Sequence, residues 1–240
     1  MIDNIALIID TNSNYSDIWK PCFGRMNKYV SGIRKYAFTD TPHGDVDIPD
    51  NVTPIIYNNT SSYRNQFLSC IKQIEEEFII YTSEDYILYD YVQMSTIKEI
   101  SKVINDGGFS FCKFIKGPEK TSHYKDNLYF IDRNDPNFFA QQASLWKTEN
   151  FMKVFETAPS ENTRMQHEPM GSSICRDLNY TGLQYFSNTN KRGIFHYDSE
   201  VYPCVVTAVV KGLWNVSEYP KEMSEIVKEY NIDLRERGWR

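Results

Sequence analysis

Two short polar segments of the chain carry residue types that suit a ligand site, and each directly follows an apolar run of strand-like composition. The segments are Asp10, Thr11 and Asn12 after residues 5–9, and Ser83, Glu84 and Asp85 after residues 78–81. Ligands of open α/β sheets bind outside the carboxyl ends of the strands, so we expect both segments at one edge of a sheet. A carboxylate there can hold Mg²⁺ or Mn²⁺ while its neighbour bonds a ribose hydroxyl. The acidic pair could equally cap the next segment or face solvent.

Two basic residues could bring positive charge to a phosphate group. Arg64 stands at the start of the helix expected before the second polar segment. Lys211 precedes Gly212, whose lack of a side chain allows close approach of the backbone to a ligand. An arginine in solvent and a lysine that caps a helix are the alternatives, and the sequence leaves them open.

The elements that must position these residues alternate between strands and helices in the first half of the chain. We predict strands at residues 5–9, 36–38, 54–57 and 78–81, and helices near residues 16–29, 61–77 and 92–104. This alternation is typical of a mostly parallel central sheet flanked by helices, so the predicted class is α/β. The sequence has no linker-like boundary and no internal repeat, and we expect a single domain over residues 1–240.

The second half of the sequence is more irregular. Residues 109–114 and 128–131 are predicted to be two further strands, paired antiparallel across the loop at Gly117 and Pro118. Further along we predict a mostly helical stretch at 138–157, a polar, turn-rich loop at 158–173, late strands at 196–197 and 204–210, and a closing helix at 218–230.

Charge and cysteine content limit the functional classes. The formal net charge is −6, which argues against a general nucleic-acid binder and against docking on anionic membranes, because both need a face rich in Lys and Arg. The five cysteines are well separated, as expected for reduced thiols in a cytoplasmic protein rather than for a disulfide framework or a zinc site. No apolar run reaches the length of a membrane span, and the first residues do not resemble a signal peptide.

The order of these motifs resembles the nucleotide-sugar glycosyltransferases of the GT-A type. In that family a hydrophobic strand runs into an Asp-x-Asp-like motif, often an acidic pair followed by an aromatic residue, and Glu84-Asp85-Tyr86 is similar. Ser83 stands where the first Asp of that motif would be. The resemblance continues through residues 141–147, residues 161–168 and the Lys-Gly-x-Trp segment at 211–214, and so it spans most of the chain. Small viral or bacterial members of the family are the most similar.

The resemblance implies an enzyme that moves a sugar from a nucleoside diphosphate donor to a hydroxyl of a glycan or another acceptor. The residues implied in donor binding are Asp10, Thr11, Asn12, Arg64, Ser83, Glu84, Asp85 and Lys211, and those implied on the acceptor side are Gln141 and Trp146. Asp85 and His196 would hold a divalent cation, Mn²⁺ or Mg²⁺, and Glu168 would be the general base of an inverting transfer. His196 is alternatively a structural histidine and Glu168 a surface glutamate.

Two other functions stay open from the sequence. A sugar-phosphate nucleotidylyltransferase would need a Gly-rich, basic loop after the first strand, whereas residues 10–14 contain no Gly, Lys or Arg. A non-catalytic nucleotide-sugar-binding module would keep the fold, and Ser83 in place of an acid is consistent with it. The sequence contains no Gly-rich phosphate loop and no evident Ser-His-Asp spacing, which disfavours Walker-type, Rossmann and hydrolase functions.

Overall fold

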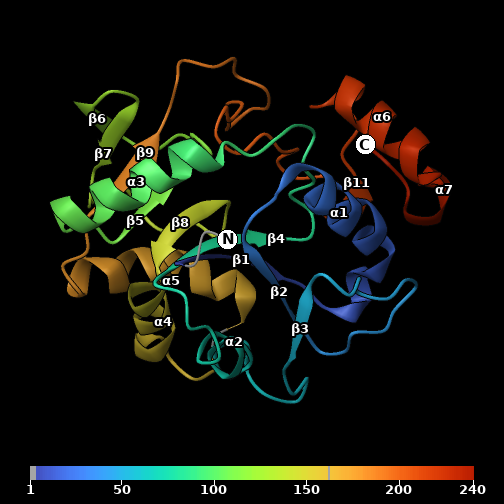
Figure 1. Ribbon diagram of the computed structural model, residues 1–240, viewed down its shortest axis with the longest axis horizontal. Helices are drawn as coiled ribbons and strands as arrows, with labels where there is room; N and C mark the ends of the chain where they lie inside the picture. Colours follow the sequence, from blue (N-terminus) through green and yellow to red (C-terminus); the bar gives the residue numbers. More distant parts are fainter. Residues whose placement is uncertain (1–3, 162) are drawn as a thin grey trace.

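The computed structural model describes residues 4–161 and 163–240, and its centre is a nine-stranded sheet (Figure 1). The strands are β1 Ile5–Asp10, β2 Arg34–Thr39, β3 Thr53–Ile56, β4 Phe78–Ser83, β5 Phe111–Lys113, β6 Thr121–Lys125, β7 Leu128–Ile131, β8 Ser144–Lys147 and β9 Gly182–Tyr185. They lie in the order β3-β2-β1-β4-β8-β5-β9-β7-β6. The first four of these are parallel, and β8 runs antiparallel between β4 and β5.

Helices cover both faces of this sheet. Those on one face are α1 Ser16–Tyr29, α3 Met94–Gly107 and α6 Pro220–Tyr230, and those on the other are α2 Tyr63–Ile71, α4 Thr148–Thr157 and α5 Arg164–Asp177 (Figure 1). Along β1, Leu7 and Ile9 belong to the core of the first face and Ile8 to the core of the second, because successive side chains of a strand alternate. The α/β class with a large central sheet between helices is confirmed.

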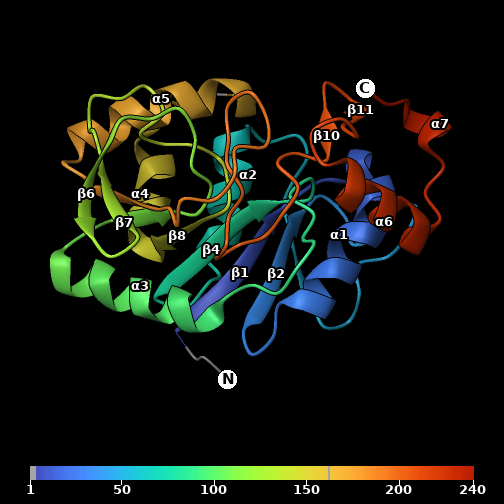
Figure 2. The same ribbon diagram turned by 90° about the horizontal axis from the view of Figure 1, so that it is seen from above.

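The carboxyl ends of β1 and β4 lie side by side, because Asp10 pairs with Ser83 in the parallel ladder. Both strands are buried along their whole length, so they have the continuous apolar composition from which the sequence predicted them. In Figure 2 these ends point toward the side that carries α5 and the hairpin of β10 (Val209–Val210) and β11 (Leu213–Trp214), opposite the N-terminus. The two polar segments therefore lie at the same edge of the sheet, as predicted.

Two predictions for the second half are wrong. Residues 138–157 are not mostly helical, because Ser144–Lys147 forms β8 and fills the gap between β4 and β5, with Leu145 in one core and Trp146 in the other. Residues 158–173 are not all loop, because α5 begins at residue 164. The Thr163 side chain accepts a hydrogen bond from the Gln166 backbone, and the Gln166 side chain accepts one from the Thr163 backbone. This capping box starts the helix.

The strand pairing predicted for residues 109–114 and 128–131 is also wrong. β9, which the sequence did not indicate, lies between them, parallel to β5 and antiparallel to β7, and β6 pairs with β7 instead. Residues 196–197 contribute a single bridge, from Lys191 to Tyr197, and the predicted strand at 204–210 shortens to β10. The chain ends on α6 and on α7, Leu234–Arg237. Within the described ranges, no helix combines the length and the apolar character that crossing a membrane requires.

Candidate functional site

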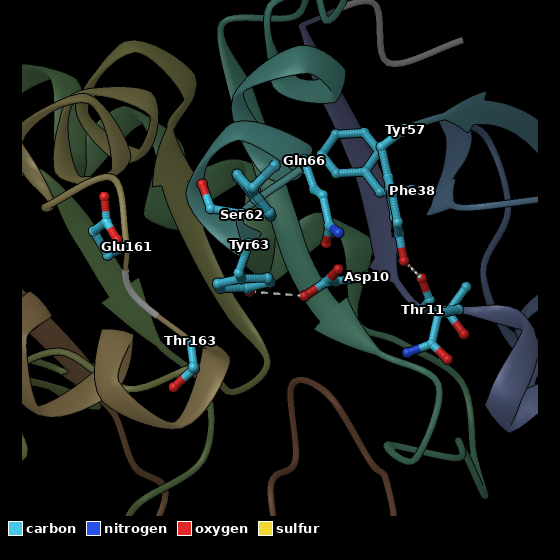
Figure 3. Close-up of a pocket in the computed structure, with 11 residues that line it drawn as sticks. Asp10, Thr11, Phe38, Tyr57, Ser62, Tyr63, Gln66, Glu161 and Thr163 are labelled. Atoms are coloured by element: carbon cyan, nitrogen blue, oxygen red, sulfur yellow. Dashed lines mark hydrogen bonds between the residues drawn. The ribbon is translucent and has the colours of Figure 1, made fainter. Parts of the chain in front are cut away.

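A pocket of about 390 Å³ lies at the carboxyl end of β1 (Figure 3). It is lined by Asp10, Thr11, Asn12, Phe38, Tyr57, Ser62, Tyr63, Gln66, Phe67, Glu161 and Thr163. The Asp10 carboxylate is buried, and its Oδ2 accepts hydrogen bonds from the hydroxyls of Tyr63 at 3.0 Å and Tyr81 at 3.2 Å. Four aromatic rings give this pocket flat apolar walls, and the carboxylates of Asp10 and Glu161 add hydrogen-bond acceptors, which suits a nucleoside. We call it the β1 pocket.

The loop after β1 is held tightly by side chains around it. The Thr11 hydroxyl accepts a hydrogen bond from Trp19 Nε1 at 2.8 Å, and the Thr11 carbonyl accepts one from the Tyr57 hydroxyl at 3.0 Å. Asn12 Oδ1 accepts from the Asn14 backbone at 2.9 Å and so caps the short 3₁₀ turn Ser13–Tyr15. All three predicted residues of this segment therefore line the pocket, with Thr11 and Asn12 also fixing the shape of the loop.

A second pocket, of about 420 Å³, lies beside the end of β4, and we call it the acidic pocket. It is lined by Tyr15, Ser83, Glu84, Asp85, Tyr86, Gln141, Glu168, Thr207, Val209, Lys211 and Gly212. The Ser83 hydroxyl donates to Asp85 Oδ1 at 2.7 Å, which fixes the direction of that carboxylate. Six residues predicted from the sequence thus meet here, although they come from the end of β4 and the loop after it, the loop before β8, α5 and the β10–β11 hairpin.

Glu168 reaches the acidic pocket from the second turn of α5. Its Oε1 accepts a hydrogen bond from the Gln141 backbone at 2.9 Å. The loop before β8 is packed on α5, because Gly171 leaves room for the ring of Phe139, where a Cβ would come within 2.4 Å of the ring. The Ser172 hydroxyl also accepts from the Phe139 backbone at 3.0 Å. These contacts orient one oxygen of Glu168 on the lining of the acidic pocket.

Lys211 occupies the tip of the β10–β11 hairpin. Its φ is +52° and that of Gly212 is +80°, so both central residues of this two-residue turn are left-handed, as a tight hairpin turn requires. The hairpin is anchored to the acidic motif through the Ala208 backbone, which donates to the Asp85 carbonyl at 2.7 Å. Among the described residues that line this pocket, Lys211 supplies the positive charge beside three carboxylates.

Three predicted residues lie elsewhere, and we correct their placement. Arg64 donates from Nε to the Phe155 carbonyl and from Nη2 to the Glu156 carbonyl, both at 2.9 Å, because the last carbonyls of α4 lack partners in the helix. The Trp146 ring is 1% exposed and stacks on Phe111 with centroids 4.1 Å apart, so it is a core residue and not an acceptor wall.

His196 is the third of these residues. Its Nε2 lies 3.0 Å from the Tyr219 hydroxyl, and burial lowers the pKa of the imidazole. It lines neither pocket in the described part of the chain. Within that part, no cluster of three or more His, Cys, Asp or Glu side chains could hold a metal ion. Asp85 and Glu84 both line the acidic pocket, and carboxylates are ligands of the type that Mg²⁺ and Mn²⁺ take in proteins.

The sequence missed one residue that connects the two pockets, Tyr63. Its hydroxyl donates to Asp10 in the β1 pocket and accepts from Gln141 Nε2 at 2.6 Å at the border of the acidic pocket. The available signal was its position as first residue of α2, at the edge where the strand ends meet. Tyrosine is too frequent in this chain, with 17 copies, for its type alone to be informative.

No protein-family model matches the sequence, and no curated protein matches it either. Among solved structures, S. aureus TarS 1–349 in complex with UDP-GlcNAc is similar, with a TM-score of 0.50, 11% identity and coverage of 97% of this chain and 69% of that chain. The fold is the nucleotide-diphospho-sugar transferase-like α/β fold. The chain spans 41% of the longer S. aureus TarS structure, at the same TM-score and identity. UDP-glucose pyrophosphorylase complexed with UDP-glucose has a TM-score of 0.48 at 9% identity, with 96% of this chain and 99% of that chain covered.

Proposed function

We propose that the protein transfers a sugar from a nucleoside diphosphate donor to an acceptor hydroxyl, with inversion at the anomeric carbon. The observation that carries this proposal is the position of Glu168 and Asp85 on the lining of one pocket, although they are far apart in the sequence. A base and a phosphate-binding acid must face a sugar from opposite sides for an in-line displacement. The fold also supports the proposal, because a protein of this fold has been solved with UDP-GlcNAc.

In this proposal the donor extends from the β1 pocket into the acidic pocket. The nucleoside contacts Thr11 and the aromatic rings of the β1 pocket, and the diphosphate lies near Asp85 and Lys211. Asp85 and Glu84 would hold Mg²⁺ or Mn²⁺, which would neutralise the diphosphate as it leaves. The Lys211 ammonium adds a second, permanent positive charge to the same group.

Glu168 then serves as the general base. Its Oε1 is held by the Gln141 backbone N–H. The other oxygen takes the proton of the acceptor hydroxyl while the hydroxyl oxygen forms its bond to the anomeric carbon. The bond from that carbon to the diphosphate breaks, and the electron pair leaves with the nucleoside diphosphate. Each donor consumed therefore yields one glycosylated acceptor and one nucleoside diphosphate.

The first experiment is a thermal-shift screen of nucleoside diphosphates and their sugars with and without Mn²⁺, since a ligand of the folded state raises the melting temperature. Donor turnover is then measured for Glu168→Gln, with Asp177→Asn, an exposed carboxylate at the far end of α5, as the matched control. We expect Glu168→Gln to keep donor affinity while turnover falls by about 10²-fold or more. Asp177→Asn should behave as wild type.

Three results would contradict the proposal. Near-normal turnover of Glu168→Gln removes this residue from the mechanism. A product that retains the donor's anomeric configuration excludes inversion. Release of pyrophosphate from a nucleoside triphosphate, or donor binding without any turnover, favours a nucleotidylyltransferase or a non-catalytic binding module.

A further inference from the structure

A chain of hydrogen bonds runs from the bottom of the β1 pocket to Glu168 in the acidic pocket. The Tyr63 hydroxyl donates to Asp10 Oδ2 at 3.0 Å, and Figure 3 shows the two side chains directed at each other across the pocket. Gln141 Nε2 lies 2.6 Å from the Tyr63 oxygen, and the Gln141 backbone N–H donates to Glu168 Oε1 at 2.9 Å. The side chain of Gln141 is thus tied to one pocket while its backbone orients the candidate base of the other.

The direction of each bond in this chain follows from the chemistry of Asp10. Asp10 Oδ2 accepts from the hydroxyls of Tyr63 and Tyr81, so the single proton of the Tyr63 hydroxyl points at Asp10. The Tyr63 oxygen can then only accept from Gln141, and the atom that faces it must be the NH₂ group of the amide. The orientation of an amide is assigned from such networks, and here the network permits one of the two.

The amide oxygen of Gln141 is consequently turned away from Tyr63. Gln141 lines the acidic pocket and is half-buried, so this oxygen is the acceptor that its side chain can offer to a ligand there. The same lining holds the carboxylates of Glu84, Asp85 and Glu168. Apart from the Lys211 ammonium, the charged and amide groups around the ligand therefore act mainly as acceptors. Such a lining fits the part of a donor that is rich in hydroxyl protons, which is the sugar.

We propose that Gln141 Oε1 accepts a hydrogen bond from a hydroxyl of the transferred sugar, and that Tyr63 is the positioning residue that sets the Gln141 amide for this contact. This inference rests on the proposed function. It makes Tyr63 and Gln141 a specificity-determining pair that favours a sugar with a hydroxyl at the contacted position over one that lacks it. A neutral hydrogen bond of this kind changes affinity by about tenfold.

The test compares, between wild type and variants, how much the sugar of the donor increases affinity over that of the nucleoside diphosphate alone. Calorimetry gives the Kd of UDP and of UDP-glucose, or of the pair that the thermal-shift screen selects, for wild type, Tyr63→Phe, Gln141→Leu and Tyr57→Phe. Tyr57→Phe is the matched control, because its hydroxyl bonds the Thr11 carbonyl at the nucleoside end of the site, where a loss changes both Kd values alike. We expect the Kd of UDP divided by the Kd of UDP-glucose to fall about tenfold in Tyr63→Phe and Gln141→Leu. In Tyr57→Phe this ratio should stay within about threefold of the wild-type value.

A second measurement needs no ligand. The side-chain NH₂ resonances of Gln141 in a ¹⁵N-correlated spectrum should shift in Tyr63→Phe and stay in place in Tyr57→Phe. Unchanged Kd ratios in Tyr63→Phe and Gln141→Leu, or unmoved resonances in Tyr63→Phe, would overturn the inference while leaving the proposed function intact. If wild type binds none of the nucleotide sugars, the proposed function fails and the sugar contact with it, whereas the resonances still decide how the amide is oriented.

Discussion

We expect the replacement of His167 by leucine to make the protein more resistant to acid. His167 precedes Glu168 on α5 and is fully buried, with its ring stacked on Phe155 at a centroid distance of 4.0 Å. The rings of Tyr63 and Phe139 lie 5.8 Å away. Neither ring nitrogen has a hydrogen-bond partner among the described residues. Burial in this apolar surrounding lowers the pKa of His167 from 6.5 to about 4.

The magnitude follows from the difference between the folded and unfolded states. The unfolded chain binds a proton at His167 below about pH 6.5, whereas the folded protein does so only below about pH 4. Between these values the unfolded state binds more protons, so the free energy of unfolding decreases as the pH falls. At about 1.4 kcal/mol per pKa unit, the shift corresponds to a loss of about 3 kcal/mol, which is complete near pH 4 and absent above about pH 7.

Urea unfolding of wild type and His167→Leu at a series of pH values between 8 and 4 measures this loss. The difference between the two free energies of unfolding should shift by about 3 kcal/mol in favour of the variant over this range, because other titrating groups contribute equally to both proteins. If the free energy of unfolding of His167→Leu runs parallel to that of wild type over this pH range, His167 is not a buried neutral histidine.

Two further predictions concern the acidic pocket. Asp85→Ala should keep the fold but lose the part of donor binding that depends on Mn²⁺. Titration of the variant with a nucleoside diphosphate, with and without Mn²⁺, measures this loss. If the variant binds the nucleoside diphosphate as tightly as wild type in the presence of Mn²⁺, Asp85 does not contact the diphosphate. Lys211→Met should weaken diphosphate binding by about tenfold at low ionic strength and by less at high salt, because a charge contact at a pocket open to solvent is screened. An effect that is independent of salt would contradict a contact between Lys211 and phosphate.

The sequence predicted those strands and helices whose burial produces a regular apolar pattern within one continuous segment of the chain. β1 and β4 are covered on both faces and are therefore apolar throughout, and helices such as α3 have one regular apolar stripe. β9 is only four residues long, and it contains a buried polar residue, Gln184, whose side-chain amide donates to the Lys113 and Tyr185 carbonyls. Its composition therefore does not indicate a strand. Its pairing depends on β5 and β7, which are distant in the sequence.

The same distinction applies to the site. Ser83 and Asp85 could be placed from local sequence, because a strand end determines where its next residues lie. Arg64 and Trp146 could not, since each was chosen for the chemistry of its type, while its position depends on a partner from another element. The α4 carbonyls bind the guanidinium of Arg64, and the second core encloses the ring of Trp146. The missed helix around Glu168 did have a local signal, the Thr163 capping box.

Two of the three groups on which the proposed reaction depends, Asp85 and Lys211, are fixed by local contacts in the chain, and Glu168 is fixed by a contact across 27 residues. The Ser83 hydroxyl sets the Asp85 carboxylate, the Gln141 backbone N–H sets Glu168, and a left-handed turn projects Lys211. A local contact orients a side chain at a small cost in conformational entropy, because it orders only a few rotatable bonds. What brings the three groups to one pocket is long-range: the Ala208 contact to the Asp85 carbonyl, and the packing of the loop before β8 on α5. Ser83 in the place of an acid is consistent with the proposed function, since a hydroxyl can orient the Asp85 carboxylate without adding a negative charge where the proposed donor would place its diphosphate.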